Sequence, residues 1–206
     1  MWLGFWQIDR LAWKEAKLAE IDARITAPAV PLPAAPREAE DEYLAVSMTG
    51  TPDDAELHVL VSGTAAGTGY RVIRAFDTGD RRILIDLGLL PLDAKSDTAD
   101  LAQGEVIGNL IWPDDVNTAT PDPDLPANIW FGRDLTAMSA ALNTDPIMVV
   151  AARMTAPDPR TTLLPVDTST IKNDHLSYAV TWFGLALVWA AMTFFLIFRV
   201  LRTKEH

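Results

Sequence analysis

The longest apolar stretch of the chain runs from Leu176 to Phe198, twenty-three residues without a formally charged side chain, and it ends at Arg199. A helix of this length rises about 1.5 Å per residue and reaches roughly 34 Å, enough to cross a hydrocarbon core of about 30 Å. Apolar side chains would point in every direction around its axis, so lipid or a partner helix must surround it. The pattern predicts a transmembrane helix over residues 175–198.

The two ends of this predicted span differ in the residues that border them. Tyr178 and Trp182 lie near the first end, and amphipathic rings prefer the level of the lipid headgroups. Three basic residues lie beyond the second end: Arg199, Arg202 and Lys204. Positive charge flanking a span is retained on the cytoplasmic side. We therefore expect residues 199–206 to form a cytoplasmic tail and everything before His175 to lie outside the cytoplasm.

A second membrane-associated segment is predicted in residues 1–25. Tryptophans and basic residues gather here, as they do where a spanning helix leaves a bilayer. They are Trp2, Trp6, Trp13, Arg10, Lys14 and Lys17. Two interpretations remain open. The segment is either the end of an N-terminal membrane helix that is truncated here, or a complete amphipathic helix that lies in the interface. In both cases the helical pattern continues to about Arg24.

A proline-rich linker is predicted over residues 26–42, before the period of the sequence changes. Four prolines in it disfavour regular helix and favour an extended path. They are Pro28, Pro31, Pro33 and Pro36. The linker would join the first membrane segment to a folded domain, and we assign it no chemistry.

One β-rich domain is predicted over residues 43–174. Period-2 alternation and flanking turn residues predict strands at 43–50, 56–63, 70–76, 83–90, 104–112 and 147–153. A turn at 78–80 makes a hairpin of the third and fourth strands. Residues 133–143 have the pattern of a short amphipathic helix that Asp134 could cap. The expected fold class is α+β: a mainly antiparallel β domain outside the cytoplasm with one or two short helices, anchored by the C-terminal transmembrane helix.

Patterns for catalysis or metal binding are weak in this domain. Gly63, Gly67 and Gly69 suggest a phosphate loop, but no GK[ST] follows and a strand succeeds them instead of a helix. The aspartates of residues 114–124 lack the spacing of a calcium loop. His58 stands alone in a strand, where a histidine is more often packed or exposed than catalytic. The chain has neither a GxSxG elbow nor any cysteine. We therefore predict that the protein is not an enzyme.

The charge of the chain limits its partners. The formal net charge is −11, and the C-terminal tail contributes +2, which leaves −13 for the remainder. A strongly acidic domain repels phosphate backbones, so no nucleic-acid partner is expected. The same charge serves solubility or steers a basic protein partner, and both interpretations stay open.

His175 has a functional interpretation because it lies at the outer end of the predicted span. A ring nitrogen there could ligate haem iron. Tyr178, Trp182 and Phe183 lie one and two helical turns further on and could flank an apolar macrocycle. Histidine and tyrosine are also ordinary residents of a membrane interface, so a polar anchor is the other interpretation.

Four motifs carry a resemblance to a known family. LGFWQIDRLAWK occupies residues 3–14 and HLSYAVTWFGLA occupies residues 175–186, with the hairpin GYRVIRAFDTGDRRILIDLGLLP and the segment NIWFGRDLTAM between them. In this order and over almost the whole chain, they resemble the surfeit locus 1 family of cytochrome c oxidase assembly factors. Two features depart from the family pattern. Most members have two spanning helices, so the resemblance predicts a truncated first helix, and the second hairpin strand has Leu87-Gly88-Leu89 where many members have RG-W or RG-F.

The resemblance implies a non-enzymatic assembly factor that helps haem a reach subunit I of a haem-copper oxidase. His175 becomes the candidate axial ligand of the haem iron. Trp182 carries over as either a wall of the haem a site or an interfacial anchor, and the anchor is favoured. Three residues of the first motif would dock the two helices or the oxidase: Trp6, Gln7 and Arg10. The implied partners are oxidase subunit I, the enzymes of haem a synthesis and membrane lipid.

A scaffold that stabilises nascent subunit I without binding haem is the alternative function. The two hypotheses differ in what they require of His175, which only a haem chaperone needs. The absence of a transit segment rich in Arg and Ser favours a bacterial inner membrane, with the main domain in the periplasm.

Overall fold

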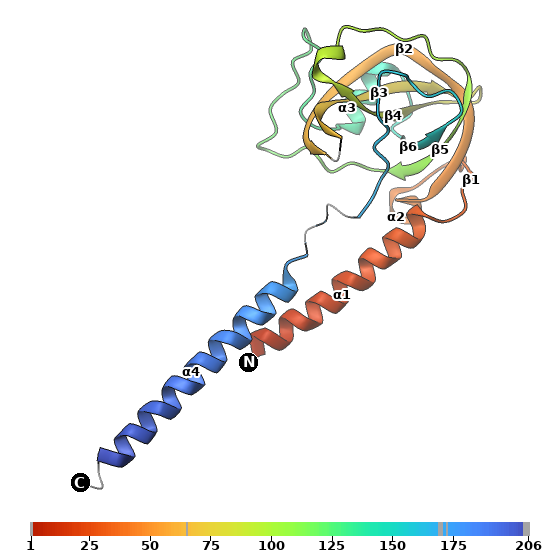
Figure 1. The fold of residues 1–206 in the computed structure, drawn as a ribbon. Helices are drawn as coiled ribbons and strands as arrows, with labels where there is room; N and C mark the ends of the chain where they lie inside the picture. Colours follow the sequence, from red (N-terminus) through yellow and green to blue (C-terminus); the bar gives the residue numbers. More distant parts are fainter. Residues whose placement is uncertain (1, 65, 169–170, 172, 204–206) are drawn as a thin grey trace. The chain divides into compact units, whose positions relative to one another are not determined.

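A computed structural model describes residues 2–64, 66–168, 171 and 173–203, and the side chains of residues 200–203 are not described. The chain divides into two compact units, Met1–Asp22 with Thr168–His206, and Ala23–Asp167. The first unit contains most of helix α1 (Trp2–Ile25) and all of helix α4 (His175–Thr203). The second contains the strands (Figure 1).

The strands of the second unit form one mixed six-stranded sheet in the order β1-β2-β3-β4-β6-β5. Their bounds are Val30–Pro31 (β1), Ala45–Thr64 (β2), Gly67–Asp77 (β3), Arg82–Pro91 (β4), Gly104–Ile111 (β5) and Met148–Met154 (β6). Strand β5 also pairs with β2, so β2 to β6 close into a ring. The result is a small five-stranded barrel, an architecture shared with the OB-fold.

The sheet contains both antiparallel and parallel strand pairs. Four strand pairs are antiparallel, but β1 pairs with β2 in parallel and β4 pairs with β6 in parallel. A parallel pair needs a long crossover, and the chain between β4 and β6 supplies it with β5 and helix α3 (Leu135–Leu142). The α+β class is confirmed, and the sheet is mixed, with antiparallel pairs in the majority as predicted.

Strand β2 joins two segments that the sequence analysis separated. Residues 45–50 pair with β5 and residues 51–64 pair with β3, with a register shift between Pro52 and Glu56. A bulge tolerates a proline, because the ladder is interrupted there. The predicted strands 43–50 and 56–63 are therefore two arms of one bent strand, and the bend lets β2 close the barrel.

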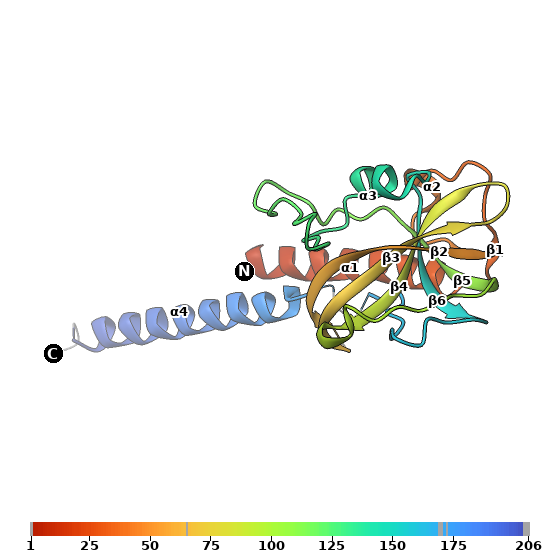
Figure 2. The ribbon, with the colours of Figure 1, turned by 90° about the horizontal axis from the view of Figure 1, so that it is seen from above.

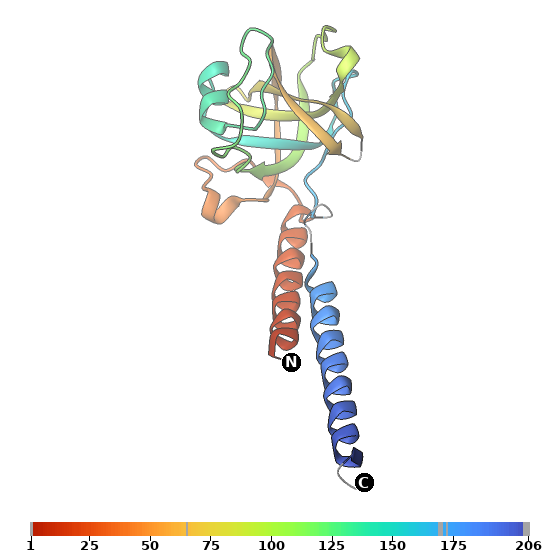
Figure 3. The same cartoon turned by 90° about the vertical axis from the view of Figure 1, so that its left-hand side faces the viewer.

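Alternating side chains of β4 supply both hydrophobic cores. Ile83, Ile85 and Leu87 enter a cluster that receives residues from all five barrel strands, while Leu84 enters a second cluster with Met138 of α3. The first cluster therefore fills the barrel, and the second packs α3 against the outer face of the ring. Helix α3 lies beside the strands in Figures 2 and 3. Each of these five side chains has no exposed surface, which explains why β4 is apolar on both faces.

The short helices agree with the sequence analysis in one place and differ in another. The Asp134 carboxylate accepts a hydrogen bond from the Ala137 amide at 2.9 Å, so the predicted cap of α3 is confirmed. The linker is not wholly extended: after Pro36 a four-residue helix, α2, forms over Glu38–Asp41. The Asp41 carboxylate accepts a hydrogen bond from the amide of Arg37, the residue that follows Pro36. A short 3-10 helix, η1, follows β4 at Leu92–Ala94.

Helix α4 covers the predicted span of 175–198 and continues to Thr203. Among the described residues, α4 is the one helix that is long enough and apolar enough to cross a membrane. Leu187, Trp189 and Phe194 each keep more than 70% of their surface exposed. A face so apolar indicates lipid or another helix as its surroundings. The predicted tail residue Lys204 lies outside the described residues, as does the side chain of Arg202. That α1 contains the end of a membrane-spanning helix stays a prediction.

Candidate functional site

The first turns of α1 pack against the first half of α4 (Figure 3). Gly4 lies under the ring of Phe183 so closely that a Cβ atom there would come within 2.6 Å of the ring's Cζ. The ring centroids of Phe5 and Phe183 are 5.3 Å apart in an edge-to-face arrangement. Ala179, one turn before Phe183, keeps only 3% of its surface exposed. A glycine and an alanine thus allow the two helices to approach closely.

A hydrogen bond joins the two helices at the start of α4. The Nδ1 atom of His175 lies 2.7 Å from Oε1 of Gln7, whose exposed fraction is 9%. An amide oxygen only accepts hydrogen bonds, so the tautomer of His175 that satisfies this contact is the one with its hydrogen on Nδ1. In a neutral imidazole the lone pair is then on Nε2, the form in which histidine binds metals. The structure therefore gives His175 a partner from α1 on its Nδ1 atom.

The other candidate haem residues share the side of α4 on which His175 lies. Tyr178 and Trp182 follow His175 by three and seven residues, a spacing that puts them on neighbouring parts of one helix face. Their exposed fractions are 56% and 38%. Trp182 also borders an open apolar groove of about 680 Å³. The other residues that line it are Trp2, Leu3, Leu185, Ala186, Val188, Trp189 and Met192.

The three predicted docking residues of α1 have different surroundings. Gln7 alone of the three is buried. Trp6 is 42% exposed, and the guanidinium of Arg10 lies 4.5 Å from the ring centroid of Trp13 on the same helix. Of these three residues, Gln7 is the one that makes a hydrogen bond to α4.

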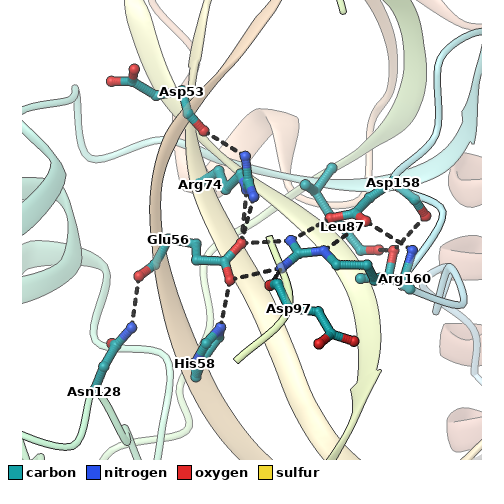
Figure 4. A network of polar contacts seen from close by, with 10 residues as sticks. Asp53, Glu56, His58, Arg74, Leu87, Asp97, Asn128, Asp158 and Arg160 are labelled. Atoms are coloured by element: carbon teal, nitrogen blue, oxygen red, sulfur yellow. Dashed lines mark hydrogen bonds and ion pairs between the residues drawn. The ribbon is translucent and has the colours of Figure 1, made fainter. Parts of the chain in front are cut away.

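A second polar cluster lies on the barrel and was not predicted from the sequence (Figure 4). The Glu56 carboxylate accepts hydrogen bonds from Arg74 at 2.6 Å, from Arg160 at 2.7 Å and from His58 Nε2 at 2.8 Å. Arg160 also donates to Asp158 at 2.7 Å. All five side chains are at least 85% buried. The cluster ties β2 and β3 to the segment that follows β6.

The charges in this cluster fix the protonation of its members. Burial acts to raise the pKa of Glu56, but hydrogen bonds from His58, Arg160 and Arg74 outweigh it and hold that pKa well below its ordinary value. Hydrogen bonds to Asp158 and Glu56 raise the pKa of Arg160 above that of an ordinary arginine. A carboxylate locked in its ionised form is a poor general acid or base near neutral pH. His58 is packed into this cluster, and a packed position was one of the two expected for it, the other being an exposed one.

A family model described as the SURF1 family matches residues 1–187. The chain belongs to the SURF1 family. Surfeit locus protein 1 of Rattus norvegicus is 31% identical over 221 residues, covering 96% of this chain and 70% of the rat protein. A SURF1-like protein of Rickettsia felis is 32% identical over 199 residues, covering 90% of this chain and 86% of that protein.

The matched range contains both polar sites of this SURF1 family member. Gln7 and His175 belong to its first and last motifs, and the Glu56 cluster lies between them. The sequence motifs single out Gln7 and His175 but not their contact. For the Glu56 cluster no local signal was available, since Arg74 and Arg160 are 18 and 104 residues away from Glu56.

The stability of this SURF1 family member is expected to fall in acid through Glu56. Its pKa in the folded state lies below the ordinary value of 4.5, so the stabilisation is complete above that pH and is lost as the pH falls towards the folded pKa. Urea unfolding of the full chain in detergent, compared at about pH 7 and about pH 3, measures this loss. The variant Glu56→Gln should lose less stability than the parent over this interval, and equal losses would contradict the assignment.

Proposed function

We propose that this protein is a membrane-anchored assembly factor for haem-copper cytochrome c oxidase that assists the delivery of haem a to subunit I. Membership of the SURF1 family and the four motifs support this role. The observation that carries the haem step is His175, with Nδ1 bonded to Gln7 and the Nε2 lone pair left for a ligand. His175 begins α4, the helix suited to span the membrane.

The residues around His175 fit one side of a haem. The imidazole supplies a nitrogen donor of the kind that binds haem iron axially. Tyr178 and Trp182 provide exposed aromatic surface on the same helix face, where an apolar macrocycle could pack. When bound, haem a would be the cargo that becomes the redox centre of the oxidase. The residues of this chain would only hold and orient it, in keeping with a protein that is not an enzyme.

The proposed placement is a bacterial inner membrane, with the barrel in the periplasm and the C-terminus in the cytoplasm. The apolar surface of α4 and the positive residues that follow it support this orientation. The acidic remainder of the chain would face the aqueous side, where it can meet a basic surface of a partner. The partners in this proposal are oxidase subunit I, the haem a synthesis enzymes and lipid, without nucleic acid.

An absorption spectrum of the full chain tests the haem step. The protein is co-expressed with the enzymes of haem a synthesis, purified in detergent and compared with His175→Ala and His175→Asn. We expect a reduced a-type band in the parent and its loss in both variants. Asparagine is the sharper replacement, because its amide keeps a polar group at this position while being a poor iron ligand.

A matched control and two contrary outcomes complete this test. Ser177→Ala changes a neighbouring α4 residue on a different helix face and should keep the band. Equal bands in the parent and in both His175 variants would rule out ligation by His175. No band in the parent, together with intact oxidase assembly in a strain carrying His175→Ala, would establish the scaffold function instead.

A further inference from the structure

The partner of the candidate haem ligand comes from the other helix of the same unit. Gln7 Oε1 and His175 Nδ1 are 2.7 Å apart, although the two residues are separated by 168 positions in the chain. The side chain of Gln7 is largely buried, so water competes poorly for its amide. The bond is therefore a specific feature of the helix pair.

This bond decides which nitrogen of His175 can bind a metal. A free neutral imidazole exchanges its hydrogen between Nδ1 and Nε2, and the hydrogen bond made by one nitrogen determines the state of the other. We propose that Gln7 is a positioning residue that holds His175 in the Nδ1–H tautomer and fixes the orientation of its ring. Nε2 then carries the lone pair. The proposal rests on the haem-binding function proposed above and assigns the residue that prepares it.

The packing on either side of the bond keeps Gln7 in reach. Gly4 lies one turn before Gln7 on the same face of α1, and it admits the ring of Phe183 at a distance that any larger residue would forbid. On α4 the contact residues His175, Ala179 and Phe183 follow one another at four-residue spacing. The Gln7–His175 hydrogen bond and the Gly4–Phe183 contact lie one turn apart on α1 and two turns apart on α4. Together they restrict both the distance between the helices and their rotation. The ring of His175 is thus held by a rigid element and not by a loop.

A bond of this kind has a known effect on metal ligands. Histidines that bind metals commonly donate their second N–H to an oxygen of the protein, which orients the ring and makes the ligating nitrogen more basic. Removing such a partner typically weakens metal affinity by about 10- to 100-fold. Gln7 occupies this role for His175 through its amide oxygen.

Nitrogen NMR of the full chain tests the tautomer without any haem. The protein is labelled with 15N-histidine in detergent, and His175→Asn identifies the signals of His175 among the three histidines. We expect a hydrogen-bearing Nδ1 and a lone-pair Nε2 in the parent. Gln7→Met removes the acceptor at nearly constant length and should shift the population towards Nε2–H. Gln7→Glu keeps an acceptor oxygen and should retain the Nδ1–H form.

The control separates the hydrogen bond from general helix packing. Phe5→Leu weakens the ring contact with Phe183 but leaves the amide of Gln7, and it should leave the tautomer unchanged. Two results would overturn the proposal. One is hydrogen on Nε2 in the parent, which would mean that the Gln7 amide donates to Nδ1. The other is a Gln7→Met protein with the tautomer of the parent.

Titration with haem a separates this inference from the proposed function. We expect Gln7→Met to raise the dissociation constant by about 10- to 100-fold, with Gln7→Glu and Phe5→Leu much closer to the parent. A parent that binds no haem a would contradict the haem-binding function, while the NMR result would still decide the role of Gln7. Equal affinity in the parent and Gln7→Met would overturn the positioning role even with the expected tautomer.

Discussion

Replacing Glu56 by Gln is expected to lower the free energy of unfolding of the barrel by about 3–5 kcal/mol. The carboxylate is the acidic partner of Arg74, whose guanidinium otherwise donates to the carbonyl of Asp53. Glutamine offers one acceptor oxygen in place of two and turns an NH2 group towards donors. Arg74 would remain buried with its charge uncompensated, which is costly in a medium of low polarity.

Urea unfolding of the full chain in detergent, followed by circular dichroism, measures the effect. Glu40→Gln is the matched control, because Glu40 pairs with Arg37 and both side chains are more than half exposed. An exposed pair contributes about 0–1 kcal/mol, so the control should stay close to the parent. Equal losses in the two variants would show that the Glu56 cluster contributes no more than a surface ion pair.

Replacing Gly88 by Ala is expected to cost about 3 kcal/mol. Gly88 has a φ angle of +89°, and a Cβ atom there would lie 2.2 Å from the carbonyl oxygen of Thr162. That oxygen accepts from the amide of Leu89, and the amide of Thr162 donates back to the Leu89 carbonyl. The substitution would therefore strain the backbone and push the segment around Thr162 off β4, with the loss of this reciprocal pair.

Gly79 offers a closely matched control for the strain alone. It has the same φ of +89°, and its amide donates to the carboxylate two residues earlier, at Asp77, as that of Gly88 does to Asp86. A Cβ atom on Gly79 would meet no atom within 4 Å. Gly79→Ala should thus cost only about 1 kcal/mol. Denaturant unfolding of both variants checks the difference, and equal costs would show that contact with Thr162 is unimportant.

Both predictions concern the same structural role, the attachment of the chain that follows β6. Arg160 binds the Glu56 carboxylate, Thr161 donates to the Leu87 carbonyl at 2.8 Å, and Thr162 pairs with Leu89. These contacts hold residues 158–162 against the barrel. A variant that releases this segment should lose barrel stability, whereas His175 and Gln7 variants should keep it.

Local sequence patterns predicted the elements of this fold well where each pattern had a single physical cause. The hairpin of β3 and β4, the capped helix α3 and the long apolar helix α4 all follow from short-range periodicity, turn residues or caps. The division of β2 into two strands was wrong because Pro52 reads locally as a strand end. In the barrel, the bulge between Pro52 and Glu56 tolerates it.

The sequence by itself determined that residues 175–198 are a candidate span, that a β domain precedes it, and that Gln7 and His175 belong to two family motifs. Only the tertiary structure decided that these two residues meet, that β5 closes the barrel on β2, and that Arg160 reaches Glu56. The physical reason is range. Periodicity and capping act over a few residues, whereas these contacts form between segments whose separation along the chain leaves no local trace and whose meeting depends on the packing of the whole unit.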